Sequence, residues 1–221
     1  FAEATPGGIF LVPGVGLLIR PDDKPYDHFR HYERAHGSDS RTTTANDSRA
    51  AMRHAVSGGG FGYVYTKTVT LPPGRPQLVI SHVLRNTGTK PIVTSVYDHN
   101  FVILNPGQGD MRVTLPFAPP QPPPQSRLAV EGNTIAWPQP LAERQTGAMT
   151  MSTTPRPYDF TVTDTKTGAS IRVQADVPAS QYKLWSIKTV MAVEPYVAID
   201  VAPGGEKRWS YTYTYAIAPP P

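Results

Sequence analysis

The chain contains no cysteine among its 221 residues, which excludes disulfides, thiolate metal sites and cysteine nucleophiles together. Charged residues are few, at 17%, and 21 Lys and Arg against 17 Asp and Glu leave a net charge of +4. That charge is too small and too dispersed to indicate a nucleic-acid partner. No stretch approaches the ~20 continuous apolar residues of a membrane span, because Pro13, Gly14 and Gly16 interrupt the longest apolar run. We therefore expect no nucleic-acid partner and no membrane span.

Turn-forming residues are abundant instead, with 25 Pro and 18 Gly. Proline breaks helices and is confined to turns, strand ends and sheet edges, so this composition argues against a helical bundle. The segments between the turns alternate with period two, as strands do. The clearest row is near the C-terminus and consists of Trp209, Tyr211, Tyr213, Tyr215 and Ile217. We predict an all-β protein, an antiparallel β-sandwich, formed by a single domain over residues 1–221.

Further segments fit this prediction. Residues 160–164 and 170–175 flank Thr165-Lys166-Thr167-Gly168, which is typical of a hairpin. Other expected strands are 63–71, 78–85, 92–104, 182–189 and 196–201. The best helical candidate, 48–56, is too short to be convincing, and the small polar residues of 38–46 indicate an exposed loop. Six prolines in 116–124 favour a stiff, extended surface loop over a domain linker, because similar strands are expected on both sides.

Common catalytic and metal motifs are missing. His28 and His31 are three apart in an expected strand, which puts them on opposite faces, and no H-x-H or HExxH spacing occurs, so we expect no metal site. The glycine-rich stretches 14–16 and 58–62 match neither the dinucleotide nor the phosphate-loop pattern. There is also no G-x-S-x-G elbow of an α/β-hydrolase.

Two segments carry ionisable groups where a buried strand is expected. The first contains Tyr97-Asp98-His99-Asn100, and in the second Glu194 precedes a proline. Burying such groups is costly unless they are paired or used. One histidine and one carboxylate can act together as proton donor and acceptor.

The order of these residues resembles the galactose mutarotase-like (aldose 1-epimerase) superfamily, in a poorly described bacterial branch. The resemblance runs from about residue 9 to 217. It rests on Lys67-x-Val69-x-Leu71, Leu78-Val79-Ile80-x-His82-x-Leu84-x-Asn86-Thr87-Gly88-x-x-Pro91-Ile92, Tyr97-x-His99-x-Phe101, Glu194-Pro195-Tyr196, Pro203-Gly204 and Trp209-x-x-x-Tyr213. It implies a large antiparallel sandwich with a sugar cleft. Members of the family are longer, so we expect the chain to begin partway through the pattern, without its first strands.

The resemblance also implies a reaction. In mutarotases a histidine protonates the ring oxygen of a sugar and a glutamate removes the proton of the anomeric hydroxyl. His99 and Glu194 match these two catalytic positions, and the reaction needs no metal or cofactor. An upstream arginine and a second histidine usually hold the sugar; Arg30, with His28 or His31, is the candidate here, and the family's further acidic residue has no clear counterpart. Aromatic rings stack on sugars, and the rings near the motif segments are Tyr65, Tyr97 and Trp185.

Three functions are open at this point. The first is a carbohydrate-active enzyme, either an epimerase or one that cleaves a glycoside. The second is a non-catalytic carbohydrate-binding module that uses the same cleft. The third is a structural sandwich whose open edge accepts a strand from another chain, so that assembly by strand exchange is expected. Because the chain begins at Phe1, we expect either a secreted or periplasmic protein after cleavage, or a fragment, and the lack of cysteine is compatible with export and with the cytoplasm.

Overall fold

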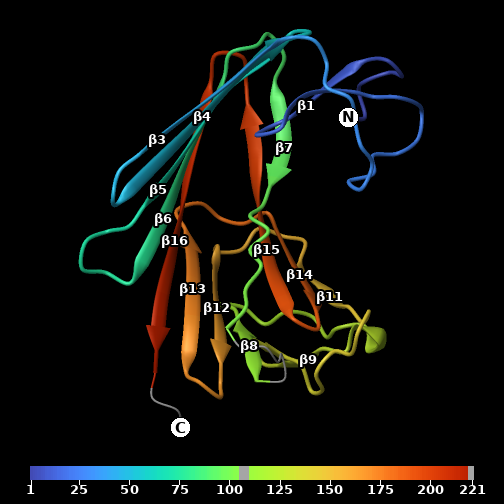
Figure 1. Ribbon diagram of the computed structural model, residues 1–221. Helices are drawn as coiled ribbons and strands as arrows, with labels where there is room; N and C mark the ends of the chain where they lie inside the picture. Colours follow the sequence, from blue (N-terminus) through green and yellow to red (C-terminus); the bar gives the residue numbers. More distant parts are fainter. Residues whose placement is uncertain (105–109, 219–221) are drawn as a thin grey trace. The chain divides into compact units, whose positions relative to one another are not determined.

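The computed structural model describes residues 1–104 and 110–218 (Figure 1). Apart from one 3-10 turn, Pro124–Ser126, every regular element in these two stretches is a β-strand. This confirms the predicted all-β class. The residues gather in two compact units: unit 1 comprises 1–70, 80–94 and 199–208, and unit 2 comprises 71–79, 95–198 and 209–218. The single domain expected from the sequence stays a prediction.

Unit 1 combines a hairpin with antiparallel strands of a sheet. The hairpin joins β1 (Ile9–Val12) to β2 (Gly16–Ile19). The sheet strands follow in chain order: β3 (Ser38–Ala45), β4 (Arg49–Gly58), β5 (Phe61–Thr70) and β6 (Gln77–Asn86). Strands β4 and β5 are connected through Gly59 and Gly60, whose φ angles of 58° and 83° suit the tight turn that glycine allows.

Unit 2 contains strands of two sheets. The first has the order β16 (Glu206–Ile217), β13 (Ala169–Ala175), β12 (Asp159–Asp164), β8 (Met111–Thr114), β10 (Thr134–Ala136) and β9 (Ala129–Glu131). The second has the order β11 (Gly147–Ser152), β14 (Gln181–Ile187), β15 (Val190–Val201) and β7 (Ile92–Val96). Strands β6, β7, β15 and β16 contribute residues to both units.

The two sheets of unit 2 enclose a hydrophobic core, as the predicted sandwich requires. Val113 and Val162 are fully buried on the first sheet, and Leu184 and Val193 are buried on the second. A hydrogen bond links the sheets, since the backbone N–H of residue 159 in β12 donates to the Tyr182 hydroxyl of β14 over 2.9 Å. The expected hairpin at Thr165-Lys166-Thr167-Gly168 joins β12 to β13 (Figure 1).

Three local expectations differ from the structure. The exposed loop predicted for 38–46 is strand β3; all eight of its residues are exposed, and it pairs only with β4 at an edge. The strand predicted for 92–104 ends at Val96. His28 and His31 lie outside any strand, so the argument from their strand faces does not apply. The proline-rich segment 116–124 forms no strand, as expected.

No helix in residues 1–104 and 110–218 is long and apolar enough to cross a membrane.

Candidate active site in unit 2

The candidate site lies where an irregular segment, which comes after β7 in the chain, runs alongside strand β15. Residues 97–101 form no ladder, and the chain rejoins β15 at an isolated bridge between Val102 and Met191. Two backbone hydrogen bonds make this bridge, of 2.8 Å and 3.3 Å. Extending its antiparallel register places His99 opposite Glu194 and Tyr97 opposite Tyr196. The side chains of the irregular segment therefore point to the same sides as they would in a regular strand.

His99 and Glu194 are in direct contact. The Nε2 atom of His99 lies 3.2 Å from Oε1 of Glu194, which is within ion-pair distance. The Glu194 side chain is 9% exposed, whereas the His99 side chain is 36% exposed and open to solvent. His99 and Glu194, which are ninety-five positions apart in the sequence, are thus in contact, and the His99 side of the pair is accessible to solvent.

Aromatic side chains lie around this pair on one face of strands β14 and β15. Three cross-strand pairs form this face: Trp185 with Ala192, Lys183 with Glu194, and residue 181 with Tyr196. The small Ala192 side chain leaves room for Trp185 to reach the irregular segment, where its ring centroid lies 5.7 Å from that of His99.

The remaining rings continue the same face. Phe101 lies 4.4 Å from the His99 ring, and Tyr97 lies 4.5 Å from Tyr196, measured between centroids. Phe101 is 61% exposed and Tyr97 is 39% exposed. Exposed rings beside an acid–base pair form a surface on which an amphipathic ligand can stack.

The electrostatic environment of Glu194 favours a base. Burial raises the pKa of the Glu194 carboxyl above its ordinary value, although the charges of His99 and Lys183 and a hydrogen bond from Tyr196 oppose the rise. Burial, and then the charge of Glu194, raise the pKa of Tyr196 to about 12, so its hydroxyl stays protonated and acts as a donor. A carboxylate with a raised pKa holds a transferred proton more readily than an ordinary one.

The opposite side of the irregular segment is anchored in the core. The Tyr213 hydroxyl of β16 donates a 2.9 Å hydrogen bond to Oδ1 of Asn100. Burial raises the pKa of Tyr213, and the charge of Asp98 raises it further, which places Asp98 beside this phenol. Asp98 and Asn100 therefore face the core, while His99 between them faces Glu194. This alternation explains why polar residues crowd the segment.

Lys183 and Tyr196 were not predicted as functional residues. The Lys183 ammonium lies 5.3 Å from the centroid of the Tyr196 ring, and both act on the Glu194 carboxyl. The position of Lys183 and Tyr196 beside Glu194 could have been inferred from the expected strands 182–189 and 196–201, because a tight turn after β14 pairs Lys183 with Glu194. The sequence alone does not fix that turn.

The other two predicted substrate-binding residues belong to unit 1. Arg30 forms an ion pair with Asp22, in which one guanidinium nitrogen, Nη1, lies 2.9 Å from each carboxylate oxygen. The Tyr65 hydroxyl lies 2.6 Å from Nδ1 of His82, which agrees with a hydrogen-bonded His82. Unit 2 thus brings together His99, Glu194, Tyr97 and Trp185, whereas the roles of Arg30 and Tyr65 stay predictions.

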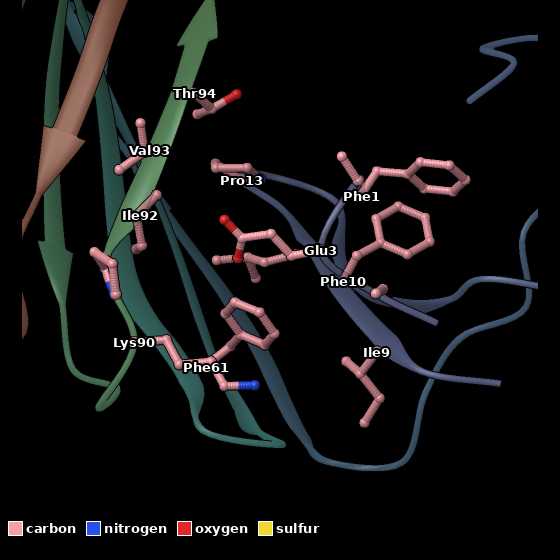
Figure 2. Close-up of a pocket in the computed structure, with 14 residues that line it drawn as sticks. Phe1, Glu3, Ile9, Phe10, Pro13, Phe61, Lys90, Ile92, Val93 and Thr94 are labelled. Atoms are coloured by element: carbon pink, nitrogen blue, oxygen red, sulfur yellow. The ribbon is translucent and has the colours of Figure 1, made fainter. Parts of the chain in front are cut away.

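Unit 1 also contains a cavity of about 350 Å³ between the N-terminal residues and the start of β7 (Figure 2). Most of its lining residues are apolar, among them Phe10, Phe61 and Ile92, but polar atoms make up about half of the lining surface, and its charged members are Glu3 and Lys90. The Lys90 ammonium lies 4.5 Å from the centroid of the Phe61 ring. The lining of this cavity includes no histidine, so it offers no counterpart of the His99–Glu194 contact in unit 2. Within the part of the chain that the structure describes, no three His, Asp or Glu side chains are grouped to hold a metal ion.

Known structures share this fold. A galactose mutarotase-like protein from Lactobacillus casei has a TM-score of 0.59 at 13% identity, over 97% of this chain and 83% of its own. A candidate aldose 1-epimerase from Escherichia coli K12 has a TM-score of 0.59 at 13% identity, over 99% of this chain and 82% of its own.

A further candidate aldose 1-epimerase, from Klebsiella pneumoniae, has a TM-score of 0.58 at 12% identity over 81% of this chain. The chain covers 54% of the length of that protein. No family model and no curated protein matches the sequence. Identities this low establish the fold and not the activity. The chain has the galactose mutarotase-like fold.

Proposed function

We propose that this protein interconverts the anomers of an aldose, with His99 as the acid and Glu194 as the base. The proposal rests above all on the 3.2 Å contact between His99 Nε2 and Glu194 Oε1. A hemiacetal carries its ring oxygen and its anomeric hydroxyl on one carbon, so these two oxygens are close neighbours. A donor and an acceptor that are also neighbours can engage both oxygens at once.

The proton transfers balance over one cycle. The His99 N–H gives its proton to the ring oxygen while Glu194 takes the proton of the anomeric hydroxyl. The bond between the anomeric carbon and the ring oxygen breaks, and an open-chain aldehyde forms. After rotation about the adjacent carbon–carbon bond, the ring hydroxyl attacks the other face of the carbonyl. Glu194 then returns its proton to the new anomeric oxygen, and His99 recovers its own.

The surrounding side chains support this chemistry. Trp185 and Phe101 provide ring faces and edges beside His99, on which the C–H face of a sugar can pack. The Tyr196 hydroxyl stays protonated and bonded to Glu194, which orients the carboxylate. Because the base works in its ionised form, the rate falls as the pH drops through the raised pKa of Glu194.

Anomer exchange measured by NMR on freshly dissolved glucose, galactose and related aldoses tests the proposal. We expect exchange faster than the buffer rate, and a loss of roughly 10²–10⁴-fold in His99→Ala and in Glu194→Gln, the usual contribution of an acid or base. His36→Ala and Glu131→Gln are matched controls, because both residues are exposed and lie outside the site. Full exchange activity in both site variants would overturn the mechanism.

A non-catalytic carbohydrate-binding module is the second candidate. The exposure of Phe101 and Tyr97 favours it, because an open ring surface suits binding to the end of a glycan. The same NMR samples separate the two functions. Saturable shifts in the Trp185 indole signals without any gain in exchange rate would indicate binding alone.

A further inference from the structure

A second charged site lies in unit 1 and consists of residues other than those of the proposed acid–base pair. Two clefts open beside the turn of the β1–β2 hairpin. One has a volume of about 490 Å³ and is lined by Val12, Val15, Leu18, Tyr26, Arg30, His31, Tyr32 and Arg34. The other has a volume of about 320 Å³ and is lined by Gly14, Arg41, Thr42, Thr43, Met52, Arg53, His54, Tyr65 and Lys67. Neither lining includes a carboxylate.

The second cleft forms where the hairpin stops covering the sheet. Near its turn the hairpin lies over Tyr63, whose hydroxyl accepts a 3.1 Å hydrogen bond from the backbone N–H of Gly14. Beyond that point the register aligns Arg41 with His54 in one row, and Thr43 with residue 52 and Lys67 in the next. Side chains two apart on a strand share a face, so these rows present cations and hydroxyls to the opening.

One carboxylate connects the two clefts. Arg34, which lines the first, lies 2.7 Å from Oδ2 of Asp39, and Arg41, which lines the second, lies 3.5 Å from Oδ1 of Asp39. His54 also contacts Asp39, over 2.8 Å. Two guanidinium groups therefore share a single carboxylate and leave a net positive charge between the clefts. Lys67 forms no ion pair among the residues that the structure describes.

We propose that the two clefts together bind an acidic polysaccharide, a chain that carries sulfate or carboxylate groups at intervals. Guanidinium and ammonium groups on both sides of Asp39 match repeated anions, and arginine suits the planar or forked oxygens of such groups. The hydroxyl of Thr43 can pair with sugar hydroxyls between the charges. This site is separate from the acid–base pair, and the inference does not depend on the proposed reaction.

A nucleic acid fits the clefts less well. Single strands bind through aromatic faces that are free to stack on bases. Here Tyr32 is buried, with Tyr26 stacked on it at 5.4 Å between centroids and the Arg30 guanidinium at 5.9 Å from its ring. The Tyr65 hydroxyl is engaged with His82. The Tyr32 and Tyr65 rings are thus already engaged, and Tyr26, which is 49% exposed, is the ring of these two linings that a base could stack on.

Binding of fluorescent dextran sulfate and of polygalacturonate, followed by anisotropy at low salt, tests the inference. Neutral dextran and an oligothymidylate serve as comparisons. We expect one or both acidic chains to bind, neutral dextran not to bind, and the affinity to fall with salt. The tighter of the two chains identifies sulfate or carboxylate as the preferred group. Because the readout is binding, failure of the proposed sugar reaction does not affect it.

Variants locate the binding. Arg34→Gln and Lys67→Gln each remove one cation, one from each cleft, and each should weaken acidic-chain binding roughly two- to five-fold, the usual weight of an exposed charge pair. The double variant should lose more than either one. Arg85→Gln, an exposed position on β6 that lines neither cleft, is the matched control and should bind as the native protein does. An equal loss in the control, tighter binding of oligothymidylate, or no binding of either acidic chain would overturn the inference.

Discussion

Replacing Tyr213 with phenylalanine tests the anchor behind the proposed site. The substitution removes one hydroxyl from a residue that is 6% exposed and keeps the ring. It breaks the 2.9 Å hydrogen bond to Asn100 Oδ1, and the Nδ2 atom of Asn100 is already buried without a partner in the described residues. A buried acceptor left unpaired costs about 1–3 kcal/mol. For a chain of this length, each kcal/mol lowers the melting temperature by roughly 2–4 °C.

Urea unfolding and thermal melting measure this loss, with Tyr215→Phe as the control. Tyr215 lies two residues along the same face of β16 and is 42% exposed, so its hydroxyl stays in water after the change and the variant should stay within about 0.5 kcal/mol of the native protein. If Tyr213→Phe is no less stable than Tyr215→Phe, the phenol does not anchor the segment. The proposed activity gives a second readout. The aldose exchange rate should fall in Tyr213→Phe and stay at the native level in Tyr215→Phe, because the anchor holds His99 against Glu194.

Three further predictions concern stability. Burial raises the pKa of Glu194, so ionising this carboxyl costs folding free energy; the cost is absent well below its ordinary pKa of 4.5 and grows as the pH rises through the raised value. Glu194→Gln should therefore be more stable than the native protein in urea at pH 8, with an advantage that vanishes in acid, and a less stable variant at pH 8 would contradict this. The Tyr158 hydroxyl is buried with no hydrogen-bond partner in the described chain, so Tyr158→Phe should keep or raise the melting temperature, whereas a loss above about 1 kcal/mol would show a missed partner. Asn86 is fully buried and makes hydrogen bonds of 2.8 Å to Lys90 O, 2.9 Å to Val201 O and 2.9 Å from Gly88 N, so Asn86→Ala should cost about 3 kcal/mol in denaturant unfolding, and a cost under 1 kcal/mol would refute its bracing role.

Period-two alternation predicted the sheet class well because burial of one face leaves a strong trace in sequence. The row from Trp209 to Tyr213 is buried as expected, and it reaches solvent only at Tyr215 and Ile217. Alternation failed at β3, because a strand that pairs on one side and is exposed throughout has no apolar face to reveal it. Its small polar residues are those of a loop, and the pairing with β4 alone makes it a strand.

The same pattern predicted the facing of His99 without predicting its backbone. Alternation over 92–104 requires His99 and Asp98 to point to opposite sides, and the structure has them so, although the strand ends at Val96. The break coincides with Pro195, which has no N–H to offer a neighbouring strand and, in the register of the Val102–Met191 bridge, lies opposite Asp98. The sequence could not fix a sugar-holding partner such as Arg30, because no motif spacing links it to His99.

The buried, ionised Glu194 carboxyl lowers the folding stability, and that loss favours a functional role for this residue. It lies on a strand whose neighbours Val193 and Ala192 are fully buried, and burial raises its pKa despite the charges of His99 and Lys183. An apolar side chain at this position would pack without that penalty. Groups that weaken the fold where packing alone would prefer something else are expected at functional sites. The same desolvation that makes the carboxylate expensive also makes it a stronger base, so the stability gain predicted for Glu194→Gln and the activity loss predicted for it have one physical origin.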